Sequence, residues 1–315
     1  MEKNVWYTYP MVEVKRVSAN KVILTSFAVD FSDLLLNFTV ALLSGSVVMV
    51  TQVLEALADL VASGFLYIGI RRAFRKDDKG HPFGYGREIY FWALLSALIM
   101  FGVTSTVSTY LGWQRFKSPE QVHDAPLAIV VLLITFFTNG YAFRVSLNRL
   151  LRSRDLKHIV RIFFQSSLVE TKTTFILDFL GTLASLWGAI ALAIYLINGD
   201  ARYDGLGAMA IGITLGIFSI LLLLGIKDLL VGRSASSETE ERIKKAALEI
   251  PEVESIIEIK TLHVGQERLL VNLDVNMKDD LSTQDLEMLI DKIKGRITRE
   301  VPSVKYLQVE LETPA

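Results

Sequence analysis

The chain has 315 residues, of which 51% are hydrophobic, and its mean hydropathy is +0.39. Soluble domains contain about 45 to 50% apolar residues even when glycine is counted, so this excess predicts a protein embedded in a lipid bilayer. The formal net charge of −1 argues against a nucleic-acid partner, and the absence of cysteine excludes disulfides, thiolate zinc sites and cysteine nucleophiles.

Six apolar stretches are long enough to cross a membrane, because a transmembrane helix needs about 20 mostly apolar residues. They cover residues 22–43, 46–70, 89–113, 126–148, 173–197 and 205–230. The first stretch follows Lys15, Arg16 and Lys21 without a small-residue cleavage site, which indicates a permanent span and not a removable signal peptide. The sequence therefore predicts an all-α bundle of six transmembrane helices.

Short basic segments predict the orientation of these spans. Lys and Arg concentrate before the first span, between the second and third, and between the fourth and fifth. Because cytoplasmic loops carry an excess of these residues, the three segments and both chain termini are predicted to be cytoplasmic. The expected localisation is a multi-pass protein of the cell (inner) membrane.

The composition changes after Gly232 to a serine-rich and then a charged pattern, which predicts a domain boundary. Helices are expected over residues 239–249 and 283–300, and strands over 253–262, 268–277 and 305–312. This order predicts a two-layer α+β domain whose helices cover one face of an antiparallel sheet. The chain is thus divided into a cytoplasmic tail (1–21), a transmembrane domain (22–232) and a cytoplasmic C-terminal domain (233–315).

Carboxylates interrupt the apolar spans and indicate an ion path. A charge in the bilayer costs about 2.5 kcal/mol or more, so such residues face a bundle interior or a water-filled cavity. Glu55 and Asp59, here called the acidic pair, are one helical turn apart on one face of the second span. In the fifth span, Thr174 and Asp178 are expected to meet the acidic pair at the membrane midplane, with Glu170 one turn earlier on the same face.

The first span carries Asp30, Asp33 and Asn37. Asp33 and Asn37 share a helix face, and Asp30 is expected near the cytoplasmic entrance. These residues are interpreted as an access path for the ion, and the alternative is that they only hydrogen-bond neighbouring helices. Adjacent carboxylates without a cationic partner in the apolar core require a bound cation or a proton, which suits the exchange of a metal for protons.

Several motifs resemble those of the cation diffusion facilitator (cation efflux) family, over nearly the whole chain from Lys21 to Thr313. They are Ser44-Gly-Ser-Val, Glu55-Ala-Leu-Ala-Asp59, His81-Pro-Phe-Gly-Tyr-Gly-Arg-Glu88, Tyr203-Asp-Gly-Leu-Gly207 and Leu262-His-Val-Gly265. The branch that they resemble most includes a divergent mitochondrial zinc transporter. The resemblance implies a homodimeric carrier with a ferredoxin-like C-terminal domain. It also implies metal/proton antiport by alternating access, with no enzymatic activity and no resident cofactor.

By this resemblance, the family's four transport ligands fall on Glu55, Asp59, Thr174 and Asp178. Glu55 and Thr174 stand where the family has His or Asp, so the site offers no imidazole. Family membership favours zinc as the transported ion, whereas oxygen-only ligands shift weight towards manganese or ferrous iron. The loss of two usual ligands also leaves an alternative, a transport-deficient scaffold or metal-sensing paralogue with a decayed site on the fifth span.

Two other regions offer further candidate metal ligands by resemblance. The loop between the second and third spans carries Asp77, Asp78 and His81, where the alternative is a turn packed against the bundle. The C-terminal domain has a single histidine, His263, so a metal-rich regulatory site is not expected there. An intramembrane enzyme would need a nucleophile with a base or a His-Glu-x-x-His motif, and the sequence contains neither.

Overall fold

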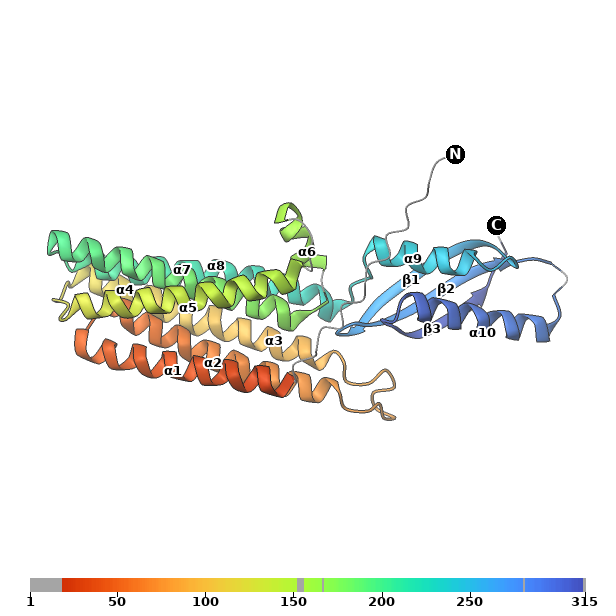
Figure 1. The fold of residues 1–315 in the computed structure, drawn as a ribbon, viewed down its shortest axis with the longest axis horizontal. Coiled ribbons are helices and arrows are strands. Elements are labelled where there is room, and N and C mark those ends of the chain that lie inside the picture. The colour runs from red at the N-terminus through yellow and green to blue at the C-terminus, as the bar shows by residue number, and fades with distance from the viewer. Residues whose placement is uncertain (1–18, 152–155, 166, 280, 314–315) are drawn as a thin grey trace.

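The computed structural model describes residues 19–151, 156–165, 167–279 and 281–313, except the side chains of 19–29, 158, 161, 162 and 165. Nearly all of the predicted tail, residues 1–21, lies outside these ranges, as do Lys15 and Arg16. Long helices lie side by side in one bundle, and a smaller α+β domain lies beyond one end of it (Figure 1).

The bundle consists of the six predicted spans. Five helical stretches in the described part are long and apolar enough to cross a membrane: α2 (Val47–Ala73), α3 to α4 (Glu88–Lys117), α5 (Ala125–Leu151), α7 (Val169–Asn198) and α8 (Arg202–Val231). α1 (Ala19–Ser44) has 26 residues and runs alongside α2. A helix of this length measures about 40 Å and exceeds the roughly 30 Å hydrocarbon core of a bilayer. The prediction of a six-helix transmembrane bundle is confirmed.

The third span contains a change of helical pitch. α3 (Glu88–Ile99) continues through a π-helical segment, η1 (Met100–Ser105), into α4 (Thr106–Lys117). At the end of η1 the Ser105 hydroxyl donates to the Gly212 carbonyl of α8 over 2.7 Å. A Cβ on Gly212 would lie 2.4 Å from Thr109 Oγ1, so glycine is required for this close approach of α4 and α8. Two short elements, η2 (Leu156–His158) and α6 (Ile159–Gln165), connect α5 to α7.

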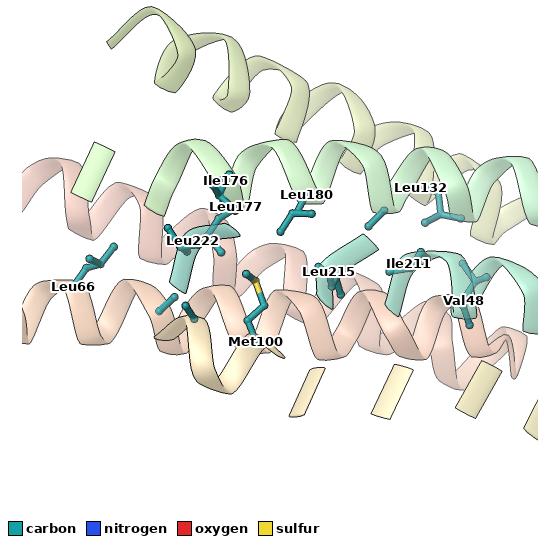
Figure 2. Close-up of a cluster of buried hydrophobic side chains, with 14 of the residues drawn as sticks. Val48, Leu66, Met100, Leu132, Ile176, Leu177, Leu180, Ile211, Leu215 and Leu222 are labelled. Atoms are coloured by element: carbon teal, nitrogen blue, oxygen red, sulfur yellow. The ribbon is translucent and has the colours of Figure 1, made fainter. Parts of the chain in front are cut away.

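An aliphatic core fills the space between α2, α3, α5, α7 and α8. Figure 2 shows Leu180 of α7, Leu215 of α8 and Met100 of η1 in the same part of this core. Leu180 and Leu215 are each 1% exposed, so this part of the bundle excludes water.

The N-terminus of α2 is held by a carboxylate from α8. Asp204 is fully buried and accepts hydrogen bonds from the Ser46 hydroxyl (2.6 Å) and from the amides of Val47 (2.8 Å) and Val48 (3.0 Å). Arg115 Nη1 lies 3.9 Å from Asp204 Oδ2. The first amides of a helix have no acceptor within the helix, and negative charge is favourable beside them. Asp204 thus fixes the start of the helix that carries the acidic pair.

The C-terminal domain contains α9 (Ser237–Leu248), β1 (Val253–Gly265), β2 (Arg268–Met277), α10 (Thr283–Glu300) and β3 (Val304–Leu311), in the predicted order. The strand order is β1-β2-β3. β1 and β2 are antiparallel, but β2 and β3 are parallel, with Leu273 opposite Val309. The prediction of a fully antiparallel sheet is therefore wrong, because α10 returns the chain to the starting end of β2 before β3 begins. Both helices pack on one face of the sheet, around Ile243, Val271 and Ile293.

The loop between α2 and α3 packs against the turn between β1 and β2. A Cβ on Gly86 would lie 2.6 Å from the Val264 carbonyl oxygen, and one on Gly265 would lie 2.9 Å from Gly86 Cα. Only glycine fits at both positions. Beside this contact, the rings of Phe83 and Tyr306 meet edge to face with centroids 5.1 Å apart. The bundle and the C-terminal domain are therefore in direct backbone contact.

Candidate cation site in the helical bundle

The carboxylates of α1 and α2 gather around a cavity of about 30 Å³. The cavity is lined by residues of α1, α2 and α5, namely Asp30, Asp33, Asn37, Gln52, Glu55, Ala56, Asp59, Thr135 and Asn139. Every lining residue except Ala56 carries a side-chain oxygen. The volume is sufficient for a water molecule or a small ion. The cavity is therefore a polar chamber inside the bundle.

The two carboxylates of α2 differ in their surroundings. Glu55 is 5% exposed, and its Oε2 accepts a hydrogen bond of 3.0 Å from Gln52 Nε2. Its Oε1 has no partner among the residues that the structure describes. Asp59 lies one turn further along and interacts electrostatically with Glu55, Asp30 and Asp178. Both members of the acidic pair line the cavity, as their shared helix face predicts.

All three polar residues predicted on α1 line the same cavity. Asp30 Oδ2 accepts a hydrogen bond of 2.9 Å from the Ser63 hydroxyl of α2, which is the helix-to-helix bond that the alternative interpretation expects. Asn37 is 2% exposed, and its Oδ1 has no hydrogen-bond partner within the described ranges. Asp33 is half-buried between them. These residues thus combine a structural contact at Asp30 with an open acceptor at Asn37.

The predicted ligands on α7 are placed differently. Neither Thr174 nor Asp178 lines the cavity. The Thr174 hydroxyl donates to the Glu170 carbonyl over 3.1 Å within its own helix. Asp178 interacts electrostatically with Asp30 and lies near Ser146 of α5, whose hydroxyl donates to the Phe143 carbonyl over 3.0 Å. Asp178 is therefore close to the cavity, whereas the Thr174 hydroxyl is directed to its own backbone.

The first third of α7 runs alongside α2. Ile176 and Leu177 of α7 lie between Leu66 and Val48 of α2 along the bundle axis (Figure 2). Among the described residues, no three Asp, Glu or His side chains are close enough together to hold a metal ion. The four-residue set predicted from the resemblance is not assembled in this arrangement of the helices.

The sequence analysis missed three polar lining residues, Gln52, Thr135 and Asn139. Thr135 is 4% exposed, and its hydroxyl has no partner in the described part of the chain. A Cβ on Gly181 of α7 would lie 2.6 Å from Asn139 Nδ2, so this glycine makes room for the amide. The available signal was the spacing of Thr135 and Asn139, which places two polar groups on one face of an apolar helix. A search for charged residues alone overlooks such a face.

The candidate ligands of the α2–α3 loop form a local turn. Asp78 Oδ1 accepts from the amides of Gly80 (3.0 Å) and His81 (2.9 Å), and Asp78 Oδ2 accepts from the Tyr85 hydroxyl (2.6 Å). The hydrogen bond from Tyr85 holds the pKa of Asp78 below its usual range. The rings of His81 and Tyr85 are 4.1 Å apart, and Asp77 is exposed. Both carboxylate oxygens of Asp78 are thus engaged within the turn.

His263 lies at the junction between β1 and the bundle. It is 8% exposed, and its Nδ1 has no partner within the part that the structure describes. Burial, and then the nearby charges of Arg233 and Lys172, lower its pKa to about 4. Two neighbouring cations make this position unfavourable for a third positive charge, whether it is a proton or a metal ion.

Comparisons with known proteins match both parts of the chain. Residues 23–225 match the family model described as the cation efflux transmembrane domain. Residues 235–313 match the one described as the cation efflux protein cytoplasmic domain.

Curated proteins from animals and bacteria are similar over most of the chain. The mitochondrial proton-coupled zinc antiporter SLC30A9 of Xenopus laevis is 23% identical over 89% of this chain and 52% of its own length. The chain thus spans about half the length of that relative. The magnetosome protein MamB of Paramagnetospirillum magneticum is 24% identical over 92% of both chains. The cation-efflux pump FieF of Yersinia enterocolitica is 24% identical over 84% of this chain and 83% of its own.

Proposed function

The chain belongs to the cation efflux family, and from this premise we propose that it exports a divalent metal cation from the cytoplasm. It is a multi-pass membrane protein. The observation that carries the proposal is the cavity between α1, α2 and α5, which has four carboxylates and neither Lys nor Arg among its described lining residues. Carboxylates in such a place require a cation or protons to compensate their charge.

Proton exchange follows from the same chemistry. A carboxylate binds a metal ion only when it is ionised, so protons and metal compete for the same oxygens. In this proposal the bundle alternates between two states. The site binds metal when it is open to the cytoplasm and releases it when protons arrive from the other side. Both chain termini and the C-terminal domain (233–315) are placed on the cytoplasmic side, and two copies meet through that domain.

The proposed transport ligands are Glu55, Asp59 and Asp178, with Thr174 or water completing the shell. The electrostatic repulsion between Asp59 and Asp178, which a cation between them would relieve, supports this set, as does the unpartnered Oε1 of Glu55 among the described residues. In the metal-bound state, α7 moves relative to α2 so that these side chains converge on one ion. Zinc is the proposed cargo because the relative in Xenopus laevis is named a zinc antiporter. Mn²⁺ and Fe²⁺ are the competitors that oxygen ligands favour.

Metal uptake into reconstituted vesicles tests this function. We expect vesicles that contain the full chain to take up Zn²⁺ faster than protein-free vesicles. A gradient that drives protons out of the vesicles should accelerate this uptake. Asp59→Asn and Asp178→Asn should each abolish transport. Glu287→Gln, at an exposed position of the C-terminal domain, should leave the rate unchanged and serves as the matched control. Wild-type rates in both Asn variants would refute the site.

A membrane scaffold without transport activity is the second candidate. It is favoured by the Thr174 hydroxyl, which bonds to its own helix backbone, and by the unassembled four-residue set of the described structure. The same vesicles decide between the two functions. If neither Zn²⁺, Mn²⁺ nor Fe²⁺ crosses under a proton gradient of either sign, the scaffold replaces the carrier.

A further inference from the structure

Three buried oxygen atoms without hydrogen-bond partners among the described residues belong to side chains that line the same cavity. They are Asn37 Oδ1 of α1, Glu55 Oε1 of α2 and Thr135 Oγ1 of α5. The three side chains are 2%, 5% and 4% exposed. A buried polar atom left unpaired costs about 1 to 3 kcal/mol, so three of them around one chamber indicate that the chamber takes up a polar guest.

The chemistry of the three atoms favours a cation as that guest. An amide oxygen, a hydroxyl oxygen and a carboxylate oxygen are the ligand types that hard divalent cations prefer. Asp30, Asp33 and Asp59 line the same cavity and add negative charge around it. No thiolate or imidazole is present among the described lining residues, which disfavours soft metals.

We propose that Asn37, Glu55 and Thr135 form a second cation-binding position, which shares only Glu55 with the transport set on α2 and α7. It takes a divalent cation through oxygen ligands alone. Gln52 orients the Glu55 carboxylate through its hydrogen bond to Oε2 and leaves Oε1 facing the ion. Glu55 belongs to both positions, so the ion keeps this carboxylate as a ligand while it passes from one position to the other. That the bound ion is the transported cargo rests on the proposed function.

The location of the second position in the bundle indicates the order in which an outgoing ion reaches the two positions. The C-terminal end of α2 lies beside the C-terminal domain, where the Arg268 guanidinium is 5.7 Å from the Phe74 ring centroid. Asn37 and Glu55 lie about two turns from the opposite end of the bundle, on either side of the turn at Gly45. The second position is therefore further from the C-terminal domain than Asp59 is. With that domain in the cytoplasm, an ion leaving Asp59 reaches the second position on its way out.

Mn²⁺ binding to the purified full-length protein tests the second position directly. Asn37→Leu and Thr135→Val should each weaken Mn²⁺ binding, measured by calorimetry or by the electron paramagnetic resonance of free Mn²⁺, by at least about tenfold. The matched control is Thr173→Val, because Thr173 is also fully buried with an unpartnered hydroxyl in the described structure but does not line the cavity. It should leave Mn²⁺ affinity unchanged. Asn37→Asp adds a charged oxygen of the same size and should tighten binding.

The outcomes separate this position from the proposed transport function. Unchanged Mn²⁺ affinity in both Asn37→Leu and Thr135→Val refutes the second position and identifies the guest as water. An equal loss in Thr173→Val also refutes it, because the effect is then not specific to the cavity. If Asp59→Asn and Asp178→Asn still abolish Zn²⁺ uptake in either case, the transport function stands alone. Weakened Mn²⁺ binding in the two cavity variants together with normal uptake by Asp178→Asn retains the second position and removes the transport set.

Discussion

Removing the carboxylate of Asp204 should destabilise the bundle more than removing any exposed carboxylate. Asp204→Ala leaves three donors without an acceptor, the Ser46 hydroxyl and the amides of Val47 and Val48. At about 1 to 2 kcal/mol for each buried donor, the free energy of unfolding should fall by about 3 to 6 kcal/mol. Arg115 keeps other acceptors, since its Nη atoms also donate to the carbonyls of Glu120 and Gly45.

The amide variant refines the expected magnitude. Asp204→Asn keeps Oδ1, which accepts from Ser46 and Val48, but replaces Oδ2 with an NH₂ group that faces the Val47 amide as donor against donor. Its cost should be about 1 to 3 kcal/mol, between the wild type and Asp204→Ala. Asp200→Ala is the matched control at the same end of α8, because Asp200 Oδ1 accepts only an exposed bond from the Arg202 amide among the described contacts. That change should cost about 1 kcal/mol.

Thermal unfolding of the purified protein in detergent micelles measures this order. The midpoint temperature should be highest for the wild type and should decrease through Asp200→Ala and Asp204→Asn to Asp204→Ala. If Asp204→Ala unfolds at the temperature of Asp200→Ala, the buried carboxylate does not hold the start of α2 and the reasoning is wrong.

Four further changes test other parts of the molecule. Glu55→His should shift uptake from Mn²⁺ towards Zn²⁺, because imidazole is the softer donor, and an unchanged ratio in competition assays would show that residue 55 does not touch the metal. Burial and two neighbouring cations lower the pKa of His263 from 6.5 to about 4. The contribution of neutral His263 to the free energy of unfolding is therefore fully present above pH 6.5. It should be lost, by about 3 kcal/mol, as the pH drops towards 4. Unfolding midpoints should show this loss in the wild type and not in His263→Gln. Gly86→Val should collide with the β1–β2 turn and speed hydrogen exchange there, so unchanged exchange would argue against the docking contact. The segment from residue 234 onwards should remain a folded soluble dimer during gel filtration with a chelator, because its core is apolar. Dissociation would indicate a structural metal.

The elements of this protein could be predicted from the sequence because their signals are local. Hydropathy indicates the spans, and period-2 and period-3.6 patterns indicate the C-terminal strands and helices. The range predicted for the second C-terminal helix, residues 283–300, is the observed one, since Ser282 and Asp285 form a capping box at its start. The direction in which two strands pair is not encoded by such local signals. The parallel pairing of β2 and β3 depends on where α10 returns the chain, which the strand sequences do not contain.

The candidate site was predictable in its charged members and in Asn37, which shares a helix face with Asp33. The acidic pair and Asp30 are conspicuous because a buried charge is costly, whereas Thr135 and Asn139 resemble ordinary helix-packing residues. Which face of α7 meets α2 depends on the packing of all its neighbours, so helix spacing alone could not place Thr174. The role of Asp204 was also hidden, because its partners belong to a helix that begins 157 residues earlier in the chain.

The contact between Gly86 and Gly265 connects the C-terminal domain rigidly to the bundle. Side chains between two moving parts absorb small displacements by changing rotamer, but here backbone meets backbone and no rotamer is available at either glycine. Gly86 lies two residues before the start of α3. A shift of the β1–β2 turn should therefore displace the start of this membrane helix directly. A displacement of the C-terminal domain is thus expected to move the start of α3 with it.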